Sequence, residues 1–130
     1  MKDPDVRLVL DLSAVLAYTV GSVELGQTII EVVEDGGRFG ASVVCLAEAT
    51  RLADDHDVLR VPLLTKHWRF EMLPVLTEDW DRLAYWTKSL GHVERAASLV
   101  EALDRGGYVV TGEPYAYDIN GTGDLPIIAI

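Results

Sequence analysis

The sequence has few of the features that mark secreted or membrane-bound proteins. It contains one cysteine, Cys45, among 130 residues. It therefore cannot form an internal disulfide, which favours a reducing compartment such as the cytoplasm. The longest uncharged run, residues 12–23, is too short to cross a bilayer. Asp11 interrupts the apolar N-terminal stretch and no small-residue cleavage site follows it, so we expect neither a signal peptide nor association with a membrane.

Positive charge is also scarce. The chain has 11 lysines and arginines against 21 aspartates and glutamates, which gives a formal net charge of −10. Such a surface repels phosphates, so long-range electrostatic capture of RNA or DNA is not expected. A nucleic-acid substrate is still possible, because metal ions or a basic partner could offset the charge locally. A metal site would itself need carboxylates, and these would contribute to the negative count.

The size and composition are those of one globular domain spanning residues 1–130. About half of the residues are hydrophobic (49%) and a quarter are charged (25%), the usual balance for a chain that buries a core. There is no low-complexity tract and no repeat at a solenoid period.

Strand-like and helix-like segments alternate along the chain. Apolar runs predict strands at residues 7–11, 41–45, 70–77, 108–112 and 125–130. Helical patterns occupy residues 13–21, 46–54, 78–91 and 92–107, and a further amphipathic helix is indicated by Leu25, Ile29, Val32 and Val33. This alternation predicts right-handed crossovers and an α/β fold, a three-layer α/β/α sandwich with a mostly parallel central sheet.

Two segments are less regular. Pro74 lies inside the run at residues 70–77, which predicts an edge or irregular strand. Residues 54–69 contain Pro62, and we expect a loop, a short helix and a second loop there. The last long helix has a clear apolar stripe, formed by Val93, Ala96, Ala97, Val100 and Leu103.

Three acids follow predicted strands. Asp11 ends the first strand and Glu113 ends the fourth, while Glu48 lies early in the helix after the second. In parallel sheets, ligands bind outside the carboxyl ends of the strands. The three carboxylates are therefore expected at the same edge of the sheet, where a site would form.

The motifs around these acids resemble those of PIN domains. They are VLDLSAVLAY at residues 9–18, CLAEATRL at 45–52, a late helix carrying an acid, and VVTGEP at 109–114. The resemblance covers essentially the whole chain and rests on the order and spacing of the motifs. Most members of that family with a known activity are small metal-dependent ribonucleases, notably the VapC-type toxins of bacterial toxin–antitoxin pairs.

The resemblance implies four metal-binding acids and one supporting hydroxyl. By position these are Asp11 with Ser13, then Glu48, Glu94 and Glu113. Glu94 is the acid nearest the expected third position, nineteen residues before Glu113, and His92 is the competing assignment. Both late positions carry Glu where the family usually has Asp. Because the longer side chain moves the carboxylate, and misplacement of about 1 Å can cost ~100-fold in rate, catalytic alignment is put in question.

The implied activity is hydrolysis of RNA phosphodiester bonds with Mg²⁺ or Mn²⁺. Asp11 would bind metal directly, and Ser13 would steady Asp11 or a phosphate oxygen. If His92 rather than Glu94 faces the site, one negative charge is lost and the ligand set shifts toward transition metals such as Mn²⁺. The implied partners are RNA, an antitoxin protein and a second copy of the chain, with residues 80–86 as a candidate surface. The alternative is a PIN-like binding or regulatory domain with weakened or lost catalysis.

Each acid also has an ordinary structural explanation. Asp11 could be the N-cap of the following helix. Glu48 could be a solvated helix residue, and Glu94 a first-turn acid favoured by the helix dipole. Glu113, just before a proline, could belong to a turn facing water.

Overall fold

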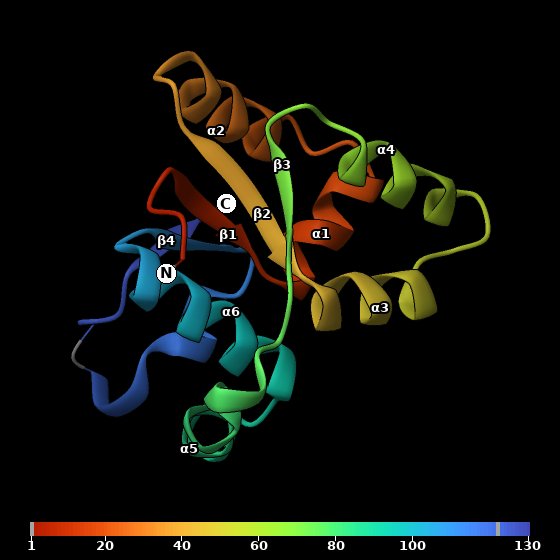
Figure 1. The fold of residues 1–130 in the computed structure, drawn as a ribbon. Coiled ribbons are helices and arrows are strands. Elements are labelled where there is room, and N and C mark those ends of the chain that lie inside the picture. Colours follow the sequence, from red (N-terminus) through yellow and green to blue (C-terminus); the bar gives the residue numbers. More distant parts are fainter. Residues whose placement is uncertain (1, 122) are drawn as a thin grey trace.

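A computed structural model describes residues 2–121 and 123–130. Within them the chain forms five strands, six α-helices and short 3₁₀ segments (Figure 1). The strands are β1 (Val6–Leu10), β2 (Arg38–Ser42), β3 (Phe70–Leu73), β4 (Tyr108–Thr111) and β5 (Ile127–Ala129). The helices are α1 (Leu12–Thr19), α2 (Val23–Glu34), α3 (Val43–Leu52), α4 (Val61–Thr65), α5 (Trp80–Leu90) and α6 (Val93–Arg105).

All strands run parallel in one sheet of order β3-β2-β1-β4-β5. The chain moves outward from β1 to β2 and β3, then returns to the other side of β1 for β4 and β5. The direction of winding therefore reverses between β1 and β4, the position where open α/β sheets leave a crevice at their carboxyl edge. In Figure 1 the arrow of β2 ends at this edge, beside the start of α3.

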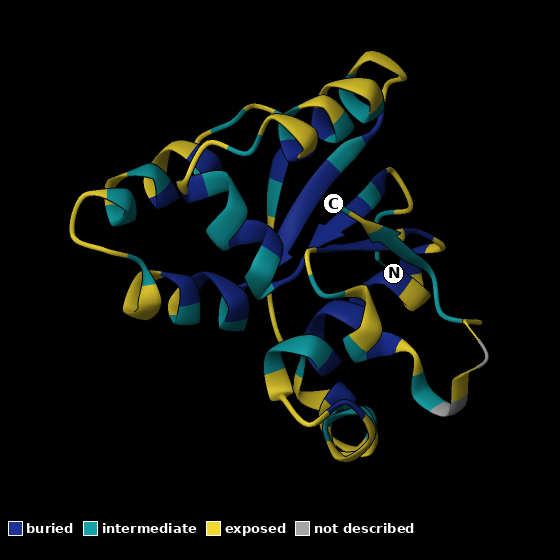
Figure 2. Cartoon of the chain, turned by 180° about the vertical axis from the view of Figure 1, so that it is seen from behind, coloured by how far each residue is buried: buried dark blue, intermediate teal, exposed yellow. Residues whose placement is uncertain are grey.

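Helices cover both faces of the sheet, which confirms the predicted three-layer α/β/α architecture. One apolar cluster joins the sheet to α1, α2, α3 and α4, with Leu8, Leu10 and Phe39 at its centre. The second joins Val9 and Val109 of the sheet to Leu90 of α5 and Leu99 of α6. Figure 2 shows the central strands buried between helices whose outer sides are exposed. Burial on both faces explains why these strands are continuous apolar runs.

The second strand was predicted too far along the chain. The run at residues 41–45 was expected to be a strand, but β2 ends at Ser42 and Val43 begins α3. The side chain of Ser42 accepts a hydrogen bond from the amide of Val44 and caps the helix. This cap outweighs the strand preference of the two valines that follow it.

The proline-containing segments behave largely as predicted. β3 is an edge strand and ends at Leu73, immediately before Pro74. Residues 54–69 contain a 3₁₀ turn and the short helix α4, with Pro62 in its first turn, where a missing N–H is tolerated.

The apolar stripe predicted on α6 is not buried at its two ends. Val93 and Leu103 are 45% and 41% exposed, whereas Leu99 is fully buried.

Within the described part of the chain, no helix combines the length and the apolar character needed to span a membrane.

Candidate functional site

All four acids and Ser13 line one pocket at the carboxyl edge of the sheet. The pocket has a volume of about 450 Å³, and its charged or titratable lining residues are Asp11, Glu48, Arg51, His92, Glu94, Arg95 and Glu113. Asp11 follows β1 and Glu113 follows β4, which are paired neighbours in the sheet. The acids come from four separate segments, so the fold, and not local sequence, assembles this pocket.

Asp11 is the most buried of the four acids, with 2% of the residue exposed. Its Oδ1 accepts hydrogen bonds from the Ser13 hydroxyl at 2.6 Å and the Ala14 amide at 3.0 Å. Its Oδ2 accepts one from the Tyr117 hydroxyl at 2.8 Å. Asp11 is therefore the N-cap of α1, as its alternative interpretation proposed, and it also faces the pocket. A carboxylate has about four acceptor positions, so these three donors fix its orientation without using all of them.

Ser13 connects the end of β1 to the end of β4. Its hydroxyl donates to Asp11 and accepts from the amide of Gly112 at 2.8 Å. The Thr111 hydroxyl lies 3.2 Å away and can donate to it, since the single Ser13 proton points at Asp11. Ser13 thus steadies Asp11, one of the two roles expected from the sequence, and it does so by joining the two motifs.

Thr111 sets the position of Glu113. Its buried hydroxyl accepts a hydrogen bond from the Glu113 amide at 2.9 Å. A hydrogen bond from a backbone amide to the threonine side chain two residues before it is common in turns. The carboxylate of Glu113 then accepts a hydrogen bond from Arg95 at 2.9 Å. Glu113 is therefore both a turn residue and one wall of the pocket.

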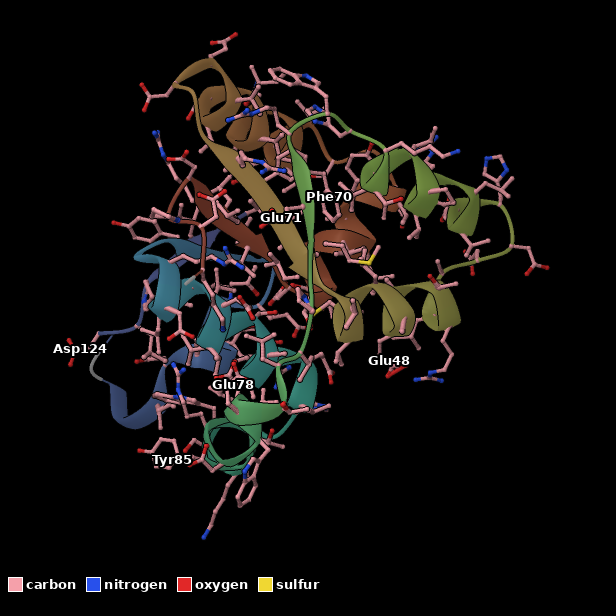
Figure 3. All side chains as sticks on the ribbon, viewed as in Figure 1. Glu48, Phe70, Glu71, Glu78, Tyr85 and Asp124 are labelled. Carbon is pink, nitrogen blue, oxygen red and sulfur yellow. The ribbon has the colours of Figure 1, made fainter. Side chains whose placement is uncertain are left out.

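Glu48 lines the pocket. Figure 3 shows its side chain on α3. It forms an ion pair with Arg51, one turn further along the same helix. The hydrogen bond from Arg51 lowers the pKa of the Glu48 carboxyl. Because both side chains reach solvent, the pair is weak and easily exchanged.

Glu94 and His92, the two alternatives for the third position, both line the pocket. His92 occupies the N-cap position of α6 and Glu94 lies in its first turn. The Nδ1 of His92 is 3.5 Å from Oε1 of Glu94, and the histidine is the more exposed side chain. The two side chains would offer neighbouring metal-binding atoms at the N-terminus of α6.

Cys45 lies behind this helix start and is not a reactive group. Its thiol is buried and contacts the Ser98 hydroxyl at 3.3 Å. Burial raises the pKa of the thiol to about 12, so it stays protonated and acts as a small apolar side chain.

Sequence reasoning missed three members of the site. Arg51 and Arg95 line the pocket, and Tyr117 supports Asp11 from the 3₁₀ turn at Pro114–Tyr117. The spacing of Glu48 and Arg51 on one helix could have indicated their pairing. No local spacing links Arg95 to Glu113 or Tyr117 to Asp11, because these contacts depend on how β4 lies against β1 and α6.

The donor chemistry of the pocket fits a hard divalent cation. Its oxygen donors are carboxylates, which suit Mg²⁺ and Mn²⁺. Four carboxylates facing two guanidinium groups leave two negative charges uncompensated. Across residues 2–121 and 123–130, however, no three carboxylate, imidazole or thiol side chains are close enough to share one ion. In the present side-chain positions, the carboxylates of Asp11, Glu48 and Glu113 accept hydrogen bonds from other groups of the chain.

No family model matches the chain, and no curated protein sequence matches it significantly.

Proposed function

We propose that this protein is a PIN-like, metal-dependent ribonuclease that hydrolyses RNA phosphodiester bonds. The observation that supports it best is the arrival of Asp11, Glu48, Glu94 and Glu113, from four segments, in one pocket at the switch point of a parallel sheet. Unrelated surface acids have no reason to gather there. Asp11 adds weight, because its buried carboxylate is held in place by three donors and still lines the pocket with acceptor capacity unused.

The roles of the residues follow from their contacts. Asp11 would be the fixed ligand, because Ser13, Ala14 and Tyr117 already orient it. Glu48, Glu94 and Glu113 would close around the ion after leaving their present partners. A divalent ion held there supplies Lewis acidity: it acidifies water and offsets the negative charge that builds on the scissile phosphate. His92 would serve as an additional donor when the ion is Mn²⁺.

The biological setting is proposed on the motif resemblance alone. It is a cytoplasmic toxin, neutralised by an antitoxin protein and acting as a homodimer. For the dimer, α5 offers a surface of the expected kind: Trp80 and Tyr85 are exposed on it. Trp86, which was included in the expected surface, packs against the core instead.

An RNA cleavage assay tests the enzymatic proposal. Wild-type protein should cleave a mixed-sequence RNA in Mn²⁺ or Mg²⁺ and not in excess chelator. Asp11→Asn should lower the rate at least ~100-fold. The matched control is Asp35→Asn, since Asp35 is an exposed acid that precedes β2 and thus lies at the opposite end of the sheet. Equal rates for Asp11→Asn and wild type would show that the site is assigned wrongly.

A second function is favoured by one specific observation. Three of the four acids already lie against cations or a potential cation: Glu48 against Arg51, Glu113 against Arg95, and Glu94 against His92. A pocket in which three of the acids already have partners from the chain can act as a binding surface without a metal ion. The protein would then be a regulatory module, which should neither cleave RNA nor bind Mn²⁺ at sub-millimolar concentration.

A further inference from the structure

Two arginines inside the pocket bind the acids that the proposed function assigns to a metal. Arg95 donates from Nη2 to Oε2 of Glu113 at 2.9 Å. Arg51 pairs with Glu48. Both guanidinium groups line the same pocket as the acids and Asp11. They therefore hold carboxylates that a divalent cation would need, and they neutralise part of the charge that would attract it.

Arg95 is built into the site more firmly than Arg51. Its side chain is 22% exposed, compared with 67% for Arg51. A second nitrogen, Nη1, donates to the backbone oxygen of Leu90 at 3.1 Å. This bond comes from the end of α5 and does not involve the acids. If Glu113 turned away, Arg95 would remain beside the pocket with one edge of its guanidinium free.

We propose that Arg95, assisted by Arg51, is an internal cation that competes with divalent metal for the carboxylates, and that Arg95, once displaced, binds a phosphate oxygen of the substrate. This inference rests on the proposed function and extends it to the regulation of the same site. Binding of the metal would then release Arg95 from Glu113 and make it available to phosphate in the same step.

The physical basis is competition between cations for the same oxygens. A carboxylate paired with a guanidinium must give up a charge-assisted hydrogen bond before it can hold an ion. The cost falls on metal affinity, so the chain binds metal less tightly than its acids alone would. The displaced guanidinium presents a planar set of donors, which matches phosphate oxygens well. By binding the displaced guanidinium, the substrate phosphate restores a charge-assisted hydrogen bond that metal binding had broken.

The test is calorimetric titration of Mn²⁺ into wild type, Arg95→Gln, Arg51→Gln and the control Arg7→Gln. Arg7 forms a comparable exposed pair with Asp35 but lies near the amino end of β1. Arg95→Gln should bind Mn²⁺ about tenfold more tightly than wild type. Arg51→Gln should gain less, because its pair is the more solvated, and Arg7→Gln should stay within about twofold. Arg51→Gln carries the test if thermal melting shows that Arg95→Gln does not fold.

A second measurement should show the opposite effect of the same substitution, namely weaker binding of a phosphate ligand. In saturating Mn²⁺, adenosine 5′-monophosphate should bind Arg95→Gln at least about fivefold more weakly than wild type, because the phosphate loses a charged donor. A merely structural role for Arg95 would weaken both ligands together. A double-mutant cycle with Glu113→Gln separates direct pairing from the general field of the charge, since the gain from Arg95→Gln should vanish when Glu113 is already neutral.

The outcomes separate this inference from the proposed function. Unchanged or weaker Mn²⁺ binding by Arg95→Gln, with Asp11-dependent binding in wild type, would overturn the inference and leave the metal site standing. Binding by Arg95→Gln alone, with none in wild type, would support the inference and overturn metal-dependent activity in the natural chain. Absence of binding in every variant would overturn both.

Discussion

The hydroxyl of Tyr117 donates a hydrogen bond to Oδ2 of Asp11 at 2.8 Å, across 106 positions of sequence. Both residues are buried. The bond connects the 3₁₀ turn after Glu113 to the end of β1, so the segment that carries one acid also orients another. Desolvation by burial and the neighbouring Asp11 charge raise the pKa of the Tyr117 hydroxyl far above its usual range, so it remains a donor.

Tyr117→Phe should therefore destabilise the fold. The substitution keeps the buried ring but leaves Oδ2 of Asp11 without this donor, which should lower the free energy of unfolding by about 1–3 kcal/mol. Urea denaturation measures the change. Tyr115→Phe is the control, because Tyr115 is highly exposed two residues away. Equal stabilities for the two variants would mean that the bond to Asp11 contributes nothing.

Ser13→Ala should loosen the junction of β1 and β4. It removes the donor to Asp11 and the acceptor for the Gly112 amide together, at a cost of about 1–2 kcal/mol in unfolding free energy. Hydrogen exchange at the Gly112 amide should become faster. Ser89→Ala, which removes an exposed hydroxyl bonded to the Tyr85 carbonyl on α5, should leave that exchange rate unchanged.

Acid should weaken the ion-pair network of Lys2, Arg82 and Asp104, residues that do not line the pocket. The Arg82 guanidinium, assisted by Lys2, holds the pKa of Asp104 at about 2, below its ordinary 3.8. A depressed carboxyl pKa in the folded state adds stability above pH 4, and that stability is lost as the pH falls from 4 to 2.

Asp104→Asn measures this contribution. The stability difference between wild type and the variant should shrink by about 1 kcal/mol between pH 5 and pH 2, a figure reduced for solvent screening. Urea denaturation at several pH values follows the difference. A difference independent of pH would show that the Asp104 carboxyl is not held by its cationic neighbours.

Cys45 should resist alkylation in the native protein. Its thiol is buried and its pKa is raised to about 12, so almost no thiolate is present at pH 8. Mass spectrometry after iodoacetamide treatment should find modification only when urea is added. Rapid labelling without urea would contradict the assigned burial.

The architecture was predictable from the sequence because its signals are local. Residues 7–11 and 108–112 are apolar runs that only a sheet covered on both faces would bury, and β1 and β4 lie there. The boundary of β2 was not predictable from apolar pattern, since the Ser42 cap converts a strand-like Val-Val pair into a helix start.

Part of the site was also predictable from the sequence, and part was not. That Asp11 and Glu113 share one edge follows from the rule that parallel strands end together, and both line the pocket. The partners of the acids were not predictable. Arg95 and Tyr117 reach Glu113 and Asp11 only because of the packing of α6 and the turn after β4, which no spacing in the sequence reports.

The most direct test of the metal site is calorimetric titration of Mn²⁺ and Mg²⁺ into wild type and Asp11→Asn, with Asp35→Asn as control. Asn fits the same position and its oxygen can keep the hydrogen bonds from Ser13 and Ala14, but the Tyr117 hydroxyl loses its acceptor, which should cost about 1–3 kcal/mol. Thermal melting therefore checks that Asp11→Asn is folded at the temperature of the titration. We predict saturable binding to wild type and to the control, and its loss in Asp11→Asn. Absence of binding to wild type, or unchanged binding to Asp11→Asn, would contradict the proposal that the acids of this pocket form a metal site.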